Sequence, residues 1–210
     1  MPFCIEVPGF VEGGPIPGHF AFCIPADTGH VAMAPNRSPL VRWAGQPVDT
    51  RSFVLLCVDS DAPTVADTVN KEGMTVPASL PRAEFCHWLL VDIPANVSEI
   101  GEAADSDGVT PRGKPVGPTP IGVRGRNDYT SWFADDPDMA GIYGGYDGPC
   151  PPWNDELAHH YMFTVCALDV DTLGLSGDFG LAEARAAMEG HVLAADSAVG
   201  TYSLNPSVTA

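Results

Sequence analysis

Basic residues are scarce in this chain. Its 210 residues include 10 Lys and Arg against 27 Asp and Glu, which gives a formal net charge of −17. A surface this acidic repels the phosphate backbones of DNA and RNA at long range, so the composition argues against a nucleic-acid partner. A negative ligand would need local cations, and the candidates besides the histidines are Arg112, Lys114, Arg124 and Arg126.

Long apolar runs are also missing. A membrane-spanning helix needs about 20 consecutive apolar residues, and no run in this sequence approaches that length. Residues 1–6 lack the basic start and the apolar core of a secretory signal. The composition is otherwise that of a globular protein, with 45% hydrophobic and 18% charged residues. We therefore predict a single domain over residues 1–210, without a membrane span and located in the cytoplasm.

The cysteines do not form a CxxC pair of the kind that binds zinc or exchanges disulfides. The six residues are widely spaced, at positions 4, 23, 57, 86, 150 and 166. Those at 57, 86 and 166 lie in or beside apolar runs, where a thiol behaves as a small buried hydrophobe. We expect free thiols rather than disulfides.

Strand-like segments dominate the rest of the chain, and 21 prolines and 22 glycines separate them at short intervals. The predicted strands are residues 19–24, 53–58, 87–93, 161–168 and 200–204. The segment 53–58 is apolar throughout, which indicates a strand covered on both faces. Only residues 181–191 have helical spacing of apolar side chains. The pattern predicts an all-β sandwich of two antiparallel sheets, with one or two short helices near the C-terminus.

Two long segments, residues 99–129 and 134–153, have the composition of irregular loops. Long loops in a compact domain are usually functional. The second loop ends in Gly148-Pro149-Cys150-Pro151-Pro152, where the fixed φ angles of proline predict a stiff wall. This wall leads directly to His159 and Tyr161.

Five polar residues lie at the ends of strand-like segments, namely Asp59, Asp61, His87, His159 and Tyr161. Alternate residues of a strand share a face. The side chains of Asp59 and Asp61 are therefore expected to lie on one face of their strand, and those of His159 and Tyr161 on one face of theirs. Carboxylates, imidazoles and a phenol in one pocket suit anion binding, acid–base chemistry or a metal.

These residues fall in four motifs that occur in the same order in a known family. The motifs are Asp59-Ser60-Asp61-Ala62-Pro63, His87-Trp88, the Gly148–Pro152 turn, and His159-His160-Tyr161. In these motifs the chain resembles the phosphatidylethanolamine-binding protein (PEBP) family, in particular its bacterial Raf-kinase-inhibitor-like branch, over residues 20–204. Residues 187–194 resemble the family's terminal helix.

The resemblance implies a β-sandwich with a pocket for phosphate, acetate or a phosphorylated head group. Carried over by position, the ligand-binding residues would be Asp59, Asp61, His87, His159 and Tyr161, with the backbone from Cys150 to Pro152 as the rim. Two positions depart from the family pattern. Ser60 replaces a frequent proline, and Cys150 stands where animal relatives have glycine, so the identity of the ligand does not transfer.

Three other functions stay open. An isomerase, cyclase or hydrolase could use the same pocket, with Asp59 orienting His87 and Tyr161 as proton donor. Two histidines and one or two aspartates could bind zinc or iron, although their spacing matches no familiar closed site, and we expect no cofactor. The resemblance also implies restraint of a kinase or protease partner and a homodimer. Aromatic residues of the loops, Trp132, Phe133, Tyr143, Tyr146 and Trp153, would then form a partner surface or, by the simpler interpretation, anchor the loops.

Overall fold

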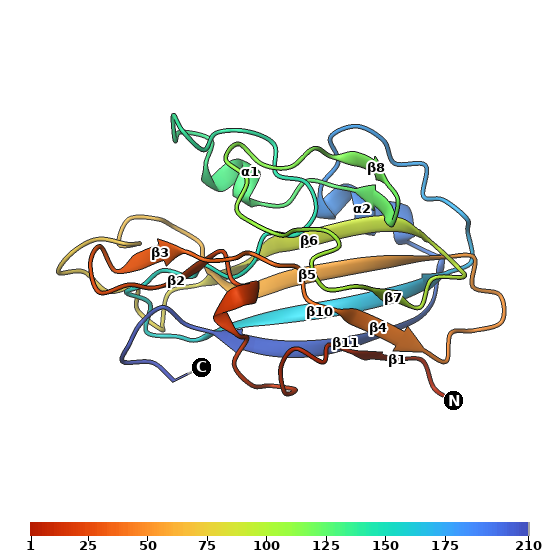
Figure 1. Ribbon diagram of the computed structural model, residues 1–210, viewed down its shortest axis with the longest axis horizontal. Coiled ribbons are helices and arrows are strands. Elements are labelled where there is room, and N and C mark those ends of the chain that lie inside the picture. The colour runs from red at the N-terminus through yellow and green to blue at the C-terminus, as the bar shows by residue number, and fades with distance from the viewer. Residues whose placement is uncertain (210) are drawn as a thin grey trace.

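A long antiparallel sheet forms the centre of the molecule (Figure 1). The computed structural model describes residues 1–209. Within them, the sheet has six strands in the order β11-β10-β5-β6-β9-β8. The four long strands are β5 (Ser52–Pro63), β6 (Arg82–Pro94), β10 (His159–Leu168) and β11 (Val192–Tyr202), and the two short ones are β8 (Gly117–Thr119) and β9 (Gly122–Arg124).

A smaller sheet packs on one face of the long sheet. Its order is β1-β4-β7, formed by Cys4–Glu6, Val41–Ala44 and Glu99–Ile100. The ring of Trp43 on β4 packs on Phe53 of β5, with ring centroids 5.2 Å apart. A two-stranded ribbon, β2 (Cys23–Pro25) with β3 (Val31–Met33), completes the strands. The predicted all-β fold is confirmed.

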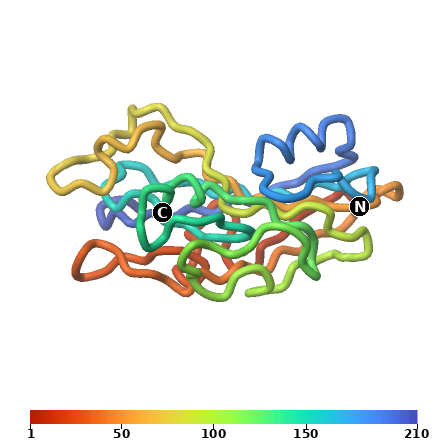
Figure 2. Tube along the Cα trace, turned by 90° about the horizontal axis from the view of Figure 1, so that it is seen from above, coloured from red at the N-terminus to blue at the C-terminus, as the bar shows by residue number. Residues whose placement is uncertain are grey.

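The long sheet is covered on both faces, as the apolar run at 53–58 predicts. Phe53, Leu55 and Cys57 belong to the hydrophobic cluster beneath the small sheet. Val54 and Leu56 point the other way, into a second cluster that includes side chains of helix α2 (Leu181–Met188). Figure 2 shows α2 standing over the side of the long sheet that lies away from the small sheet. Because side chains alternate between the two faces of a strand, β5 contributes to two hydrophobic clusters, one on each face of the long sheet.

Helices are short. The predicted helix at 181–191 ends at Met188 because Gly190 adopts a left-handed conformation with φ 82°, which glycine accepts without steric cost. The chain then enters β11 at Val192, which pairs along its whole length with β10. The expected helix across 187–194 is therefore wrong beyond Met188, and the strand predicted at 200–204 is the end of a longer one. Helix α1 (Tyr129–Trp132) was not expected, and neither was the 3-10 turn η1 (Gly18–Phe20), which overlaps the start of the strand predicted at 19–24.

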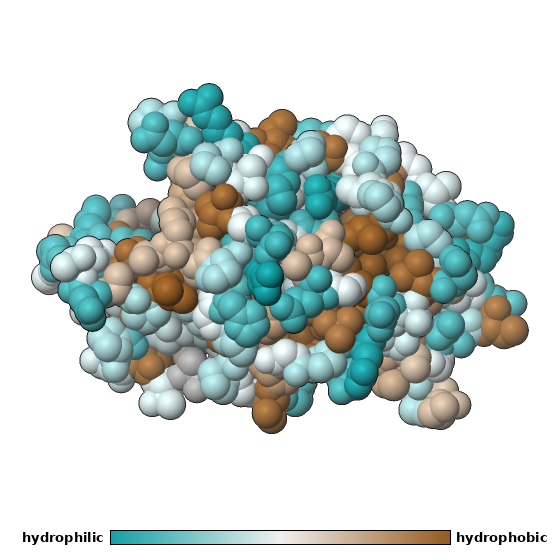
Figure 3. Space-filling model, in the orientation of Figure 1, coloured by the Kyte–Doolittle hydropathy of each residue, from teal (hydrophilic) through white to brown (hydrophobic). Residues whose placement is uncertain are grey.

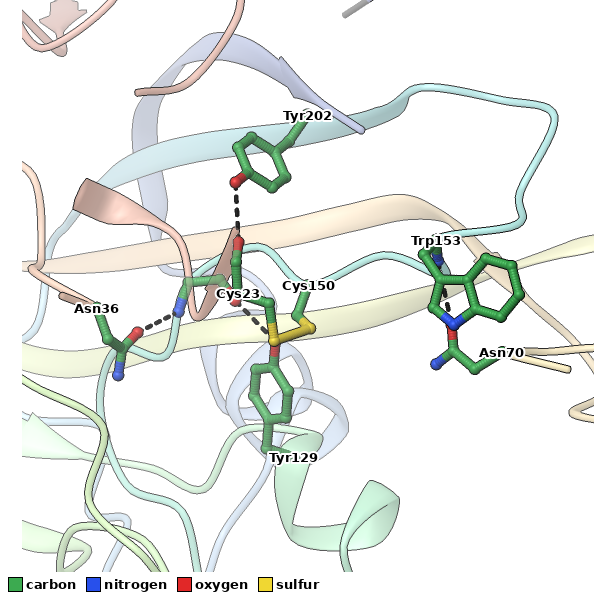
Figure 4. The surroundings of a disulfide bond; sticks show 8 residues. Cys23, Asn36, Asn70, Tyr129, Cys150, Trp153 and Tyr202 are labelled. Carbon is green, nitrogen blue, oxygen red and sulfur yellow. Dashed lines mark hydrogen bonds between the residues drawn. A yellow bond between two sulfur atoms is a disulfide. The ribbon is translucent and has the colours of Figure 1, made fainter. Parts of the chain in front are cut away.

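Cys23 and Cys150 form a disulfide (Figure 4). Their Cα atoms are 4.9 Å apart although 127 positions separate them in sequence. The contact forms because the backbone N–H groups of Phe22 and Cys23 both donate to the carbonyl of Pro149, which brings β2 against the proline-rich turn. The prediction of free thiols is wrong for this pair. It holds for Cys57, Cys86 and Cys166, which are buried as expected, and for Cys4, which is exposed.

Candidate functional site

A pocket of about 230 Å³ opens where the ends of β5, β6 and β10 meet the proline-rich turn. Six of the seven predicted site residues line it, namely Asp59, His87, Cys150, Pro152, His159 and Tyr161. Strand register explains the meeting. Asp59 of β5 lies opposite Tyr161 of β10 on one side and Phe85 of β6 on the other, so residues about 100 positions apart in sequence become neighbours.

Asp61, the seventh predicted residue, does not line the pocket. The pairing of β5 with β6 shifts register between Asp59 and Ala62, and an irregularity of this kind breaks the alternation of side chains. The carboxylate of Asp61 instead accepts hydrogen bonds from the backbone N–H and Nδ1 of His160, at 2.8 and 2.9 Å. The expectation that Asp59 and Asp61 point the same way is therefore wrong.

His159 is held between two carboxylates. Its Nδ1 donates to Asp59 Oδ2 at 2.7 Å and its Nε2 donates to Asp155 Oδ2 at 3.1 Å. Burial by itself would lower the pKa of His159, but the hydrogen bonds to Asp155 and Asp59 outweigh it and raise the pKa to about 9. His159 is therefore an imidazolium at neutral pH, and both of its N–H groups are already used inside the protein.

Asp155 continues this network to Arg82, which donates to its two carboxylate oxygens at 2.6 and 3.0 Å. Burial would raise the pKa of Asp155, yet the hydrogen bonds from His159 and Arg82 lower it to about 2. Neither residue was predicted from the sequence. The only local sign of Asp155 is its position four residues before His159, while Arg82 becomes a neighbour only through the hairpin of β5 and β6.

His87 has a different environment. Its Nδ1 donates to the backbone carbonyl of Asp147 at 2.8 Å, and the N–H of Asp147 donates back to the carbonyl of His87. Burial lowers the pKa of His87, although Asp59 and the hydrogen bond to Asp147 oppose the shift. Because a carbonyl oxygen can only accept, Nδ1 keeps its proton and Nε2 is left with a lone pair. Asp59 does not orient His87, contrary to the enzyme hypothesis, since its partner is His159.

The buried carboxylate of Asp147 holds this arrangement in place. It accepts hydrogen bonds from Asn36 at 2.8 Å, Lys114 at 2.7 Å and Asn127 at 2.9 Å. Asn36 also accepts from the N–H of Gly148, and Figure 4 shows it beside the disulfide. The loop that fixes the tautomer of His87 is thus tied to the same turn that forms the pocket wall.

Tyr161 brings an unused hydroxyl to the pocket. The residue is fully buried, and its hydroxyl has no hydrogen-bond partner within residues 1–209. Its ring stands edge-on to His87, with centroids 5.1 Å apart. Burial raises the pKa of Tyr161 well above its usual value, so the group stays a donor. Most buried hydroxyls have a partner, so the hydroxyl of Tyr161 is a donor that the protein itself leaves unused.

The cations that the sequence offered for an anion lie elsewhere. Lys114 pairs with Asp147, Arg124 with Asp105 and Arg126 with Asp178. Arg112 donates to the carbonyl of Pro137. None of the four lines the pocket. In the described part of the chain, no group of three or more His, Cys, Asp or Glu side chains is arranged to hold a metal ion.

The rest of the lining, which we call the rim, is mostly apolar. It comprises Ala62, Pro63, Val65, Ala66, Val69, Phe85, Trp132, Pro151 and Pro152, together with Thr64, Asn70 and Tyr129. Trp132 is half-exposed at this rim, whereas Tyr143 and Tyr146 of the same loop set are fully buried anchors. Trp153 stacks on His30, with centroids 3.7 Å apart. A molecule that fills the pocket would therefore place a polar head beside His87 and Tyr161 and an apolar part at the mouth.

The family follows from comparison with known proteins. The family model described as phosphatidylethanolamine-binding protein matches residues 6–203. The chain belongs to this family. UPF0098 protein YbcL of Escherichia coli (strain K12) is 30% identical over 172 residues, which are 81% of this chain and 70% of that protein. A UPF0098 protein of Methanothermobacter thermautotrophicus is 30% identical over 167 residues, 80% of this chain and 83% of that protein.

Solved structures support the fold. The crystal structure of E. coli YbcL, described as a new member of the mammalian PEBP family, matches with a TM-score of 0.68 and 24% identity, and the match covers 97% of this chain and 99% of that one. A putative PEBP homologue from Chlamydia trachomatis, CT736, matches with a TM-score of 0.64 and 22% identity, over 96% and 97% of the two chains. The PEBP-like sandwich is thus the fold of this chain.

Proposed function

We propose that this PEBP-family chain binds a small ligand through an oxyanion, such as a phosphate, in the pocket at the ends of β5, β6 and β10. The observation that supports this is the unpartnered hydroxyl of Tyr161, whose ring packs edge-on to His87 at 5.1 Å between centroids, while the hydrogen bond of His87 to Asp147 leaves Nε2 without one. A tetrahedral oxyanion has several oxygens on one centre, so one group can contact both side chains.

Charge inside the pocket is balanced. The carboxylate of Asp59 accepts a hydrogen bond from protonated His159, so a negative ligand meets an ion pair and not an isolated carboxylate. The absence of Lys and Arg from the lining favours a ligand with low charge. The apolar rim favours one that carries a hydrophobic substituent, since its burial adds about 25 cal/mol per Å².

The test is calorimetric titration with phenyl phosphate, which combines a phosphate head with an apolar ring. Tyr161→Phe removes one donor to a charged acceptor, an interaction of about 1.5–3 kcal/mol, so affinity should fall about tenfold or more. Tyr146→Phe is the matched control, because its buried hydroxyl donates to the carbonyl of Phe20 outside the pocket. Equal affinities of the two variants would contradict the site.

The resemblance also suggests a homodimer and a kinase or protease partner, and the N-terminal sequence suggests a cytoplasmic location; all three stay proposals. On the face shown in Figure 3, hydrophobic residues form several separate patches among hydrophilic ones, a distribution that singles out no partner surface there. Among the helices of residues 1–209, none is long and apolar enough to cross a membrane.

A further inference from the structure

Two buried side chains of the pocket, Tyr161 and His87, together offer a ligand one hydrogen-bond donor and one acceptor. Tyr161 supplies the donor. His87 supplies the acceptor, because its Nδ1 proton is committed to the carbonyl of Asp147 at 2.8 Å and its Nε2 makes no hydrogen bond within the described chain. An oxyanion without a proton has only acceptor oxygens. Such a group would satisfy Tyr161 but would place lone pairs against the lone pair of Nε2.

We propose that the pocket selects oxyacid groups that keep one proton, such as a phosphomonoester or phosphonate monoanion, over oxyanions that cannot hold a proton, such as sulfonates. This inference rests on the proposed function and names the class of ligand for the same site. In the complex, one oxygen of the ligand accepts from Tyr161 and the remaining proton lies between another oxygen and His87 Nε2.

The groups around His87 explain why it does not supply the proton itself. Three carboxylates act on it through their charge, from β5, the turn before α1 and the long loop, and each accepts hydrogen bonds from other donors. Asp59 accepts from His159 at 2.7 Å, Asp128 from the N–H of Cys86 at 2.6 Å, and Asp147 from Lys114 at 2.7 Å. The other neighbours are the rings of Phe85, Tyr129 and Tyr161.

Within residues 1–209 no carboxylate therefore pairs with the ring of His87, and the effect of its burial is only partly offset. Burial lowers the pKa of His87 despite Asp59, Asp128 and Asp147, which act in the opposite direction. His159, the second imidazole of the site, already donates both of its N–H groups to carboxylates. Neither histidine has a free N–H for the ligand at neutral pH.

The proton balance gives a direct measurement. A phosphomonoester has a second pKa of about 6, so at pH 7.5 it is mostly a dianion in solution. Binding of its monoanion to neutral His87 then takes up about one proton from the buffer. Benzenesulfonate has a similar tetrahedral head and ring and a single charge, but it has no proton to keep.

The experiment is titration of the wild-type protein with phenyl phosphate and with benzenesulfonate at pH 7.5, each in two phosphate-free buffers that differ in ionisation enthalpy. We expect uptake of about one proton with phenyl phosphate and at least tenfold weaker binding of the sulfonate. Absence of proton uptake, or equal affinity for the sulfonate, would overturn this inference and leave the proposed function standing. Failure of both compounds to bind would overturn the proposed function as well.

His87→Gln provides a second test. The side-chain amide can donate to an oxyanion, so we expect the preference for phenyl phosphate over benzenesulfonate and the proton uptake to be lost together, with binding of both retained. A thermal unfolding curve checks that the variant is folded. A folded variant that keeps the full preference would assign the selectivity to another group and overturn the inference.

Discussion

Asp155 and His159 lie four residues apart, and the carboxylate of one accepts from Nε2 of the other at 3.1 Å. Both side chains are almost completely buried. This contact links the pair of Asp59 and His159 to Arg82. The four side chains form a buried series of alternating negative and positive charges, and the series ends at the pocket with Asp59.

Removing the negative charge of Asp155 should destabilise the fold. In Asp155→Asn, Arg82 and His159 lose the carboxylate they share, and breaking a buried ion pair typically costs about 3–5 kcal/mol. The matched control is Asp171→Asn, whose partner Arg51 is exposed and whose loss should cost about 0–1 kcal/mol. Urea unfolding measures both, and similar small losses would contradict a structural role for the network.

The pKa values of the two pocket histidines should be shifted in opposite directions from the usual histidine value. His159, with a pKa of about 9, binds its proton more tightly in the folded than in the unfolded chain. Its contribution to stability is therefore complete below about pH 6.5 and is lost as the pH rises through about 9. His87 should stay neutral below the usual histidine pKa, because burial lowers its value. NMR titration of the ring protons, with His87→Gln for assignment, measures both, and coincident midpoints would refute the expected difference.

At acid pH, the stability that this network contributes should depend on Asp155. Its pKa of about 2 lies below the unfolded value, so its contribution to stability is present above about pH 4 and is lost as the pH falls through about 2. We expect the unfolding free energy of the wild type to fall in this range more steeply than that of Asp155→Asn. Parallel curves would show that another carboxylate governs acid unfolding.

The disulfide should stabilise both the fold and the pocket wall, because Cys150 lines the pocket. In the chain-entropy model, a loop closed across 127 positions contributes up to about 4–5 kcal/mol. The double change Cys23→Ser and Cys150→Ser should lower the unfolding free energy by about 2–4 kcal/mol and weaken phenyl phosphate binding. Cys4→Ser, at an exposed thiol, is the control.

Counting thiols tests the same bond independently. The unreduced, denatured protein should show the four free cysteines at positions 4, 57, 86 and 166, and the reduced protein should show all six. Six reactive thiols without reductant would mean that the bond does not form under those conditions.

Features set by local pattern were predictable from the sequence. The apolar run at 53–58 predicted a strand with two covered faces because side chains alternate along any strand, whatever its partner. Four motifs in a fixed order likewise predicted the family. They also predicted six residues of the pocket without any knowledge of strand pairing.

The tertiary structure decided what depends on register and long-range contacts. Asp61 turns away because β5 and β6 shift register beside it, and no pattern within β5 marks that shift. Cys23 meets Cys150, and Arg82 meets Asp155, only after distant segments pair. The sequence predicted six of the side chains that line the pocket. Their hydrogen-bond partners, and hence their protonation states, arose from the packing of segments that lie far apart in the chain.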